Sequence, residues 1–218
     1  MSRIAFRPEV HGAGNVPRVG PVILAANHLS VVDSFLIPLV TPRRVSFLAK
    51  EEYFRSGNPK QWLTRAFIEG TDAIPVPRGG YRAAQESLAA ALRVLEGGGA
   101  FGIHPEGSRS RDGRLYRGRT GIARMALEAH VPVVPVVMVD TDTMMPIGRR
   151  IPRIARVGVV IGEPLDFSRF EGMAGDRYIL RSVTDEIMVA LHRIGSQEYD
   201  DVYASTVKDR LKSRPAAS

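Results

Sequence analysis

The sequence has no cysteine, and only 7% of its 218 residues are aromatic. Without cysteine, the chain can have no disulfide, no thiolate nucleophile and no cysteine-ligated zinc, and cysteine usage gives no information on redox compartment. The scarcity of aromatic rings beside the basic clusters disfavours nucleic acid as a partner, because single strands bind by stacking their bases on such rings.

Long apolar runs are also absent. No stretch approaches the ~20 apolar residues that span a bilayer, and residues 1–14 lack the apolar core of a signal peptide. We therefore expect a cytoplasmic protein that associates peripherally with the inner face of the cell membrane.

Lysine is scarce, because 26 of the 30 basic residues are arginine. With 23 acidic residues the net charge is +7, which favours an anionic partner such as a phospholipid head group or a coenzyme phosphate. An Arg-rich genome would explain the net charge equally well, but it explains the local clusters less well.

Short apolar runs predict strands, and apolar residues at helical spacing predict helices between them. This alternation indicates an α/β fold with a mostly parallel or mixed central sheet flanked by helices. The length suits one domain, residues 1–200, followed by a polar, basic tail, residues 201–218. The predicted strands are 22–26, 73–76, 99–103, 133–139 and 156–161, and the predicted helices are 84–95, 122–129 and 176–194.

His28 and Asp33 follow the first of these strands directly. Within one regular helix, residues five apart lie ~140° apart around the axis, so the two side chains meet only if a helix begins between them. Ser30 is placed to be the N-cap of such a helix, with Asp33 in its first turn. By themselves the two residues are weak evidence for a site.

A second polar cluster, His104-Pro105-Glu106-Gly107-Ser108-Arg109-Ser110, follows another predicted strand. Gly107 allows close approach of the backbone to a ligand, Arg109 can bind a phosphate and Glu106 can accept hydroxyl hydrogens. On its own this segment is more typical of a solvated turn. Further arginines extend the charge through a predicted loop, residues 109–119: Arg111, Arg114, Arg117 and Arg119.

Taken together, these motifs resemble the glycerolipid acyltransferase family, which includes 1-acylglycerol-3-phosphate acyltransferase. Its first motif, Asn-His followed by four residues and Asp, matches residues 27–33. Its third, an aromatic residue followed by Pro-Glu-Gly-Thr-Arg-Ser, is similar to residues 104–110, with His104 at the aromatic position. Its fourth, a Val-Pro-Ile-Val-Pro-Val strand, matches residues 131–136. The resemblance extends from about residue 10 to 162.

The resemblance implies transfer of a fatty acyl group from a thioester to the free hydroxyl of lysophosphatidic acid, making phosphatidic acid for phospholipid synthesis. His28 would be the general base and Asp33 its partner, with no metal and no cofactor besides the thioester of coenzyme A or acyl carrier protein. Arg78, which ends a second motif where Pro77 replaces the usual Asp, and Arg109 would bind the acceptor phosphate. Glu106 and Gly107 would shape the acceptor site, and Lys50 is a further candidate there.

Other functions stay open at this stage. One alternative is an acyltransferase whose acceptor is another lyso-lipid or glycerol-3-phosphate. A metal-dependent hydrolase would use His28, Asp33, His104 and Glu106 as ligands. A basic module that only binds anionic lipid is a third class.

One basic segment indicates contact with a membrane. Four arginines at 149, 150, 153 and 156 are interleaved with isoleucines at 147, 151 and 154. Such a mixture can place apolar side chains among lipid head groups while the cations meet phosphates. The other interpretation is a solvated Arg-rich loop between two strands.

Overall fold

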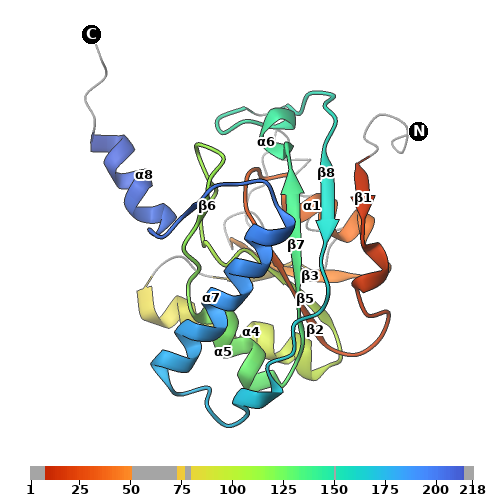
Figure 1. Cartoon of the computed structure of the whole chain (residues 1–218), viewed down its shortest axis with the longest axis vertical. Coiled ribbons are helices and arrows are strands. Elements are labelled where there is room, and N and C mark those ends of the chain that lie inside the picture. Colours follow the sequence, from red (N-terminus) through yellow and green to blue (C-terminus); the bar gives the residue numbers. More distant parts are fainter. Residues whose placement is uncertain (1–7, 51–72, 77–79, 150, 214–218) are drawn as a thin grey trace.

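Within the residues that the structure describes, the central sheet has seven strands in the order β1-β8-β7-β2-β5-β3-β4 (Figure 1). The computed structural model describes residues 8–50, 73–76, 80–149 and 151–213. All neighbouring strands run parallel except the antiparallel pair of β7 and β8. The strands are β1 (Glu9–His11), β2 (Val22–Ala26), β3 (Val45–Lys50), β4 (Ile74–Val76), β5 (Ala100–Ile103), β7 (Val133–Val139) and β8 (Gly158–Ile161).

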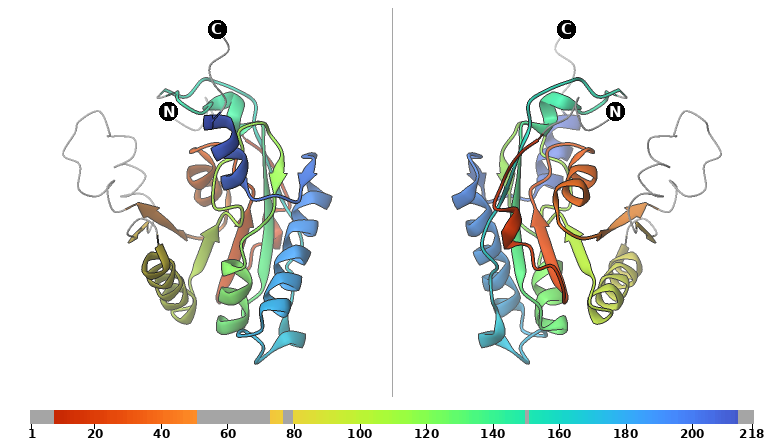
Figure 2. Two further views of the ribbon diagram at one scale, coloured as in Figure 1. Left: turned by 90° about the vertical axis from the view of Figure 1, so that its left-hand side faces the viewer. Right: turned by 90° about the vertical axis from the view of Figure 1, so that its right-hand side faces the viewer.

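Helices cover both faces of this sheet. Helices α4 (Gly80–Glu96), α5 (Gly121–Ala129) and α7 (Arg177–Ile194) pack on one face, and α1 (Asp33–Val40) packs on the other. Figure 2 shows α7 (blue) and α1 (orange) on opposite sides of the central strands. Helix α6 (Thr141–Met144) follows β7, and α8 (Ala204–Ser213) is near the C-terminus. Within the described residues, no helix combines the length and the apolar character needed to cross a bilayer.

Strand β2 lies at the centre of the sheet, between β7 and β5, and its five residues are all buried. Its side chains alternate between two apolar cores, as the twofold period of a strand requires. Ile23 and Ala25 pack with the layer of α4, α5 and α7, whereas Leu24 and Ala26 pack with α1. This burial explains the apolar run, and it places the residues after Ala26 at the carboxyl edge of the parallel strands, where α/β proteins commonly bind ligands.

The structure confirms the predicted α/β class and each predicted strand and helix, with small shifts at their ends. The last strand begins at Gly158 instead of residue 156, and α7 begins at Arg177, capped by the side chain of Asp176. The interpretation of residues 109–119 as one loop is wrong, because β6 (Leu115–Tyr116) lies within them and pairs with β9 (Tyr199–Asp200). A strand of two residues is too short to show a period.

The segment predicted as a polar tail, residues 201–218, contains helix α8. Strand β9 directly precedes this segment, and the backbone N–H of Arg117 donates a hydrogen bond to the carbonyl of Val202 within it. Ala204, the first residue of α8, is buried, and the guanidinium of Arg119 lies over the ring of Tyr203. The start of this segment is therefore packed on the domain.

Candidate active site

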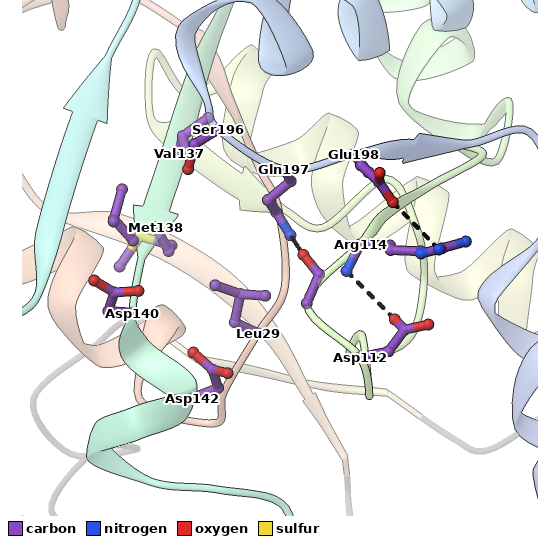
Figure 3. Close-up of a pocket in the computed structure, with 12 residues that line it drawn as sticks. Leu29, Asp112, Arg114, Val137, Met138, Asp140, Asp142, Ser196, Gln197 and Glu198 are labelled. Carbon is purple, nitrogen blue, oxygen red and sulfur yellow. Dashed lines mark hydrogen bonds and ion pairs between the residues drawn. The ribbon is translucent and has the colours of Figure 1, made fainter.

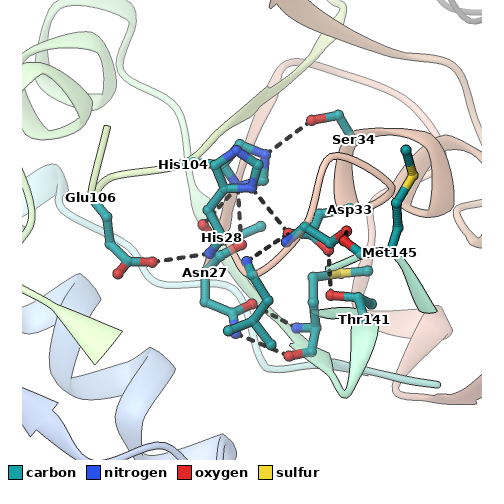
Figure 4. A network of polar contacts seen from close by, with 12 residues as sticks. Asn27, His28, Asp33, Ser34, His104, Glu106, Thr141 and Met145 are labelled. Atoms are coloured by element: carbon teal, nitrogen blue, oxygen red, sulfur yellow. Dashed lines mark hydrogen bonds and ion pairs between the residues drawn. The ribbon is translucent and has the colours of Figure 1, made fainter. Parts of the chain in front are cut away.

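His28 and Asp33 are in direct contact at the carboxyl end of β2. Nδ1 of His28 lies 3.0 Å from Oδ2 of Asp33 (Figure 4). Helix α1 begins at Asp33, so the chain turns between the two residues, which is the condition that the sequence spacing imposed. The side chain of Asp33 is fully buried, whereas that of His28 is 18% exposed.

The carboxylate of Asp33 is held by several donors besides His28. The backbone N–H groups of Leu29 and Ser30 each donate to Oδ2 over 2.8 Å, and the Thr141 hydroxyl donates to Oδ1 over 2.5 Å. Burial raises the pKa of Asp33, and the hydrogen bonds from Thr141, Ser30 and Leu29 oppose that increase. Thr141 is the first residue of α6, and it was not singled out in the sequence. Its position just after β7 is the same kind of signal that marked His28.

Ser30 is not the N-cap of α1. The cap position is Val32, and no side chain caps this helix end. The Ser30 hydroxyl instead donates to the carbonyl oxygen of Met145 over 2.8 Å. Serine fits the cap pattern from local sequence, but an acceptor 115 residues away takes its hydrogen. Ser30 therefore ties the loop between His28 and α1 to the end of α6.

The hydrogen bond to Asp33 fixes the tautomer of His28. Because the carboxylate accepts, Nδ1 carries the hydrogen and Nε2 has a free lone pair. Burial, with a smaller contribution from the positive charge of Arg109, lowers the pKa of His28 to about 3. The imidazole is therefore neutral at pH 7 and able to accept a proton.

His104 packs on His28 and connects three elements of the site. The two rings stack with centroids 3.9 Å apart and planes 10° apart. Nδ1 of His104 lies 3.1 and 3.0 Å from the carbonyl oxygens of Ala26 and Asn27, so it carries the hydrogen, and Nε2 lies 3.1 Å from the Ser34 hydroxyl. Burial and the neighbouring His28 lower the pKa of His104 to about 3. His104 is thus a neutral ring that links the ends of β5 and β2 to α1.

Glu106 is buried, and both oxygens of its carboxyl group accept hydrogen bonds. Oε1 accepts the backbone N–H of His28 over 3.0 Å, and Oε2 accepts that of Tyr116 over 2.9 Å. Burial raises the pKa of Glu106 to about 8, against the opposing effect of these two hydrogen bonds. The role predicted for Glu106 at the acceptor site stays a prediction, and this geometry favours a role exerted through the backbone of His28.

Asn27 anchors the same turn from the other side. Its side-chain amide pairs with the backbone of Met138 in β7, donating to the carbonyl over 3.0 Å and accepting the N–H over 2.7 Å. The amide also donates to Oε1 of Gln197, which follows α7. The family motif was read from Asn27 and His28 together, and the structure explains the Asn: it continues the pairing of β2 with β7 by one residue.

Arg109 lies close enough to His28 for its charge to lower the pKa of that residue. It is half-buried, and its guanidinium has no hydrogen bond or ion pair within the described ranges. A partly buried guanidinium without a protein partner is suited to an anionic ligand. Gly107, two residues earlier, has φ +70° and faces the side chain of Arg119, so a Cβ there would be strained and crowded.

The other arginines of this region are mostly engaged. Arg114 pairs with Glu198 over 3.2 Å, and Arg117 lies 3.6 Å from Asp201. Arg119 donates to Ser205 over 3.1 Å. The side chain of Lys50, which ends β3, and the whole of Arg78 lie outside the described residues.

A cavity of about 430 Å³ lies at the same edge of the sheet, bordered by Leu29 (Figure 3). Its lining is acidic, and its one arginine, Arg114, pairs with Glu198. Such a lining repels an anion. The carboxylates of the lining are Asp112, Asp140, Asp142 and Glu198.

The geometry argues against the metal-dependent hydrolase. The stacked rings of His28 and His104 are parallel, and their hydrogen bonds go to Asp33, to carbonyls and to Ser34, while Glu106 binds two backbone N–H groups. Among the residues that the structure describes, no three His, Asp or Glu side chains are grouped to hold a metal ion.

Comparison with known proteins shows the family of the chain. Residues 7–139 match the family model described as Acyltransferase, which covers more than half of the chain. The chain belongs to this family. The match includes His28, Asp33 and the whole segment 104–110.

Curated relatives carry the name 1-acyl-sn-glycerol-3-phosphate acyltransferase. One from Limnanthes douglasii is 33% identical over 120 residues, covering 55% of this chain and 41% of the relative. The human alpha enzyme is 33% identical over 139 residues, covering 61% and 46%. The chain thus spans less than half the length of these relatives.

The fold is shared with a solved acyltransferase structure. The 1-acyl-sn-glycerophosphate acyltransferase PlsC from Thermotoga maritima superposes with a TM-score of 0.65 at 24% identity, covering 98% of this chain and 75% of the other. The likeness supports the same architecture.

Proposed function

We propose that this chain is an acyltransferase that moves a fatty acyl group from an acyl thioester to the free hydroxyl of lysophosphatidic acid, giving phosphatidic acid. The observation that carries the proposal is the contact of the partly exposed His28 with the buried Asp33 at the end of the central strand. Membership of the Acyltransferase family and the names of the curated relatives support the same reaction.

In the proposed mechanism, Nε2 of His28 takes the proton of the acceptor hydroxyl as its oxygen attacks the thioester carbon. The carbon–sulfur bond then breaks, and His28 passes the proton to the departing thiolate. General base catalysis of this kind contributes ~10²–10⁴-fold. Asp33 holds the imidazole in the reactive tautomer and stabilises the imidazolium that forms. No acyl-enzyme is needed, because the acceptor supplies the hydroxyl.

Arg109 is the proposed contact for the acceptor phosphate. Its guanidinium is half-buried, it lies near His28, and it is unpaired in the described part of the chain. Arg78 is proposed for the same phosphate on the family resemblance. Because the proposed acceptor resides in a membrane and the chain has a net charge of +7, we further propose that it acts at the anionic inner face of the cell membrane.

Product identification tests this function. Purified protein is offered oleoyl-coenzyme A or oleoyl-acyl carrier protein with lysophosphatidic acid, glycerol-3-phosphate or lysophosphatidylethanolamine, and products are identified by mass spectrometry. We expect phosphatidic acid as the main product, dependent on His28. Acylation of another acceptor in preference would correct the substrate, and hydrolysis without transfer would reject the acyltransferase.

A further inference from the structure

The segment between α6 and β8, residues 145–157, exposes large apolar side chains. The exposed fractions of Ile147, Ile151 and Ile154 are 40%, 72% and 80%. Isoleucine is among the residues most often buried in folded proteins. Three exposed isoleucines within eight residues therefore indicate a surface that contacts something apolar. We name the described residues of this segment, 145–149 and 151–157, the docking loop.

All charged residues of the docking loop are basic. No acidic residue occurs from 143 to 162. Arg149, Arg153 and Arg156 are exposed, and none forms an ion pair with another described residue. Nε of Arg149 donates to the carbonyl of Ile151 over 2.9 Å, and its other two guanidinium nitrogens have no partner among the described residues. Arg150 lies outside the described residues. Exposed cations alternate with exposed isoleucines, which suits a surface that is both anionic and apolar.

The first residue of the docking loop, Met145, is hydrogen-bonded to the active-site loop. The Met145 carbonyl accepts the Ser30 hydroxyl, and Thr141, four residues earlier, bonds Asp33 (Figure 4). The backbone N–H of Arg153 donates to the Met144 carbonyl over 2.8 Å, which closes the loop onto α6. The loop thus projects from the end of the sheet that carries His28 (Figure 1).

We propose that the docking loop is the surface by which this chain binds an anionic phospholipid bilayer. The isoleucines enter the boundary between head groups and acyl chains, and the arginines pair with lipid phosphates. A bilayer is the fitting occupant because it offers negative charge directly above apolar chains, matching the alternation in the loop. This inference rests on the proposed function, since a lipid acceptor brought to the loop then lies beside His28.

Vesicle co-sedimentation tests the proposal with the full 218-residue chain. The vesicles contain phosphatidylcholine alone or phosphatidylcholine mixed with phosphatidylglycerol, across a salt series. One variant changes Arg149, Arg153 and Arg156 to Gln, and a second changes Ile147, Ile151 and Ile154 to Ser. A charge-matched control changes three exposed arginines outside the docking loop to Gln: Arg18, Arg93 and Arg177.

We expect the wild-type chain and the control to bind the anionic vesicles at low salt and to be released at high salt. The arginine variant should bind about 100-fold more weakly, because each cation near an anionic surface contributes about 5-fold. The isoleucine variant should lose at least about 10-fold. Wild-type binding that ignores lipid charge, no binding at all, or variants that bind like the control would overturn the proposal.

A parallel assay separates this inference from the proposed function. A short-chain lysophosphatidic acid, dissolved as monomers, needs no membrane docking, so the wild-type chain and both loop variants should acylate it at equal rates. Absence of turnover in all of them would reject the proposed function while the vesicle result stands. Normal turnover with unaltered vesicle binding by the variants would reject the docking loop alone.

Discussion

The imidazole rings of His28 and His104 stack with their centroids 3.9 Å apart and their planes inclined by only 10°. His104 is itself fixed by the carbonyl oxygens of Ala26 and Asn27 and by the Ser34 hydroxyl. The stacked ring of His104 therefore fixes the plane of the His28 imidazole, and the hydrogen bond to Asp33 fixes the direction in which its Nδ1 edge points.

This stack predicts different outcomes for two substitutions of His104. His104→Phe keeps a ring against His28, and the family commonly has an aromatic residue there, so kcat should stay within about 3-fold of wild type although the lost hydrogen bonds lower stability by ~1–3 kcal/mol. His104→Ala should lower kcat at least about 10-fold, because small misplacements of a catalytic group are costly. Steady-state kinetics and urea unfolding measure both. Equal kcat in the two variants would contradict the orienting role of the ring.

Thr141 predicts a change in pH dependence. Its hydroxyl bonds Asp33 and favours the ionised carboxylate. Thr141→Val removes that donor, so the pKa of Asp33 rises and the acid limb of the kcat profile moves to higher pH. The loss of a hydrogen bond to a charged group, ~1.5–3 kcal/mol, corresponds to about 10-fold or more in kcat if expressed fully in the transition state. Thr141→Ser keeps the donor and is the matched control. An unshifted acid limb in the valine variant would show that Thr141 does not support Asp33.

Arg109 predicts a selective effect on the acceptor. Arg109→Ala should raise KM for lysophosphatidic acid about 10- to 150-fold, because a charge-assisted contact is worth ~1.5–3 kcal/mol, while KM for the thioester changes little. Arg111→Ala, which removes a neighbouring exposed arginine, serves as the charge control. We expect the same selectivity for Arg78→Ala. An acceptor KM that is equal in the Arg109 and Arg111 variants would place the phosphate elsewhere.

Glu106 predicts an unusual dependence of stability on pH. Burial raises its pKa from 4.5 to about 8, so the folded chain holds a proton that the unfolded chain releases. The stability that Glu106 contributes is therefore full below about pH 4.5 and is lost as the pH rises to about 8. We expect the free energy of unfolding of wild type relative to Glu106→Gln to fall by roughly 1 kcal/mol per pH unit over this interval. Urea unfolding of both proteins at several pH values measures it, and a constant difference would contradict the raised pKa.

Sequence patterns predicted the layers of the fold because burial imposes a period. The apolar run of β2 has five residues and the apolar face of α7 extends over 18, which is long enough for each element to be recognised in the sequence. Strands β6 and β9 have two residues each, and their pairing joins positions far apart in the chain, so no local pattern marks them.

The candidate residues His28 and Asp33 were found through the family motif, because their position after a buried strand is weak evidence by itself. The residues that hold them were harder to find, because their partners are distant in sequence. Thr141 bonds Asp33 across 108 residues, and Ser30 bonds Met145 across 115. Such tertiary contacts override the local N-cap pattern that Ser30 displays.

The most direct test of the central claim is a kinetic cycle on His28 and Asp33. Initial rates of phosphatidic acid formation are compared for wild type, His28→Ala, Asp33→Ala and the double variant, each verified as folded by circular dichroism. If the pair acts as one unit, each single variant should lower kcat at least ~100-fold, and the double variant should be no more than about 3-fold slower than His28→Ala. A folded His28→Ala chain with near-normal kcat, or losses that multiply in the double variant, would contradict the account.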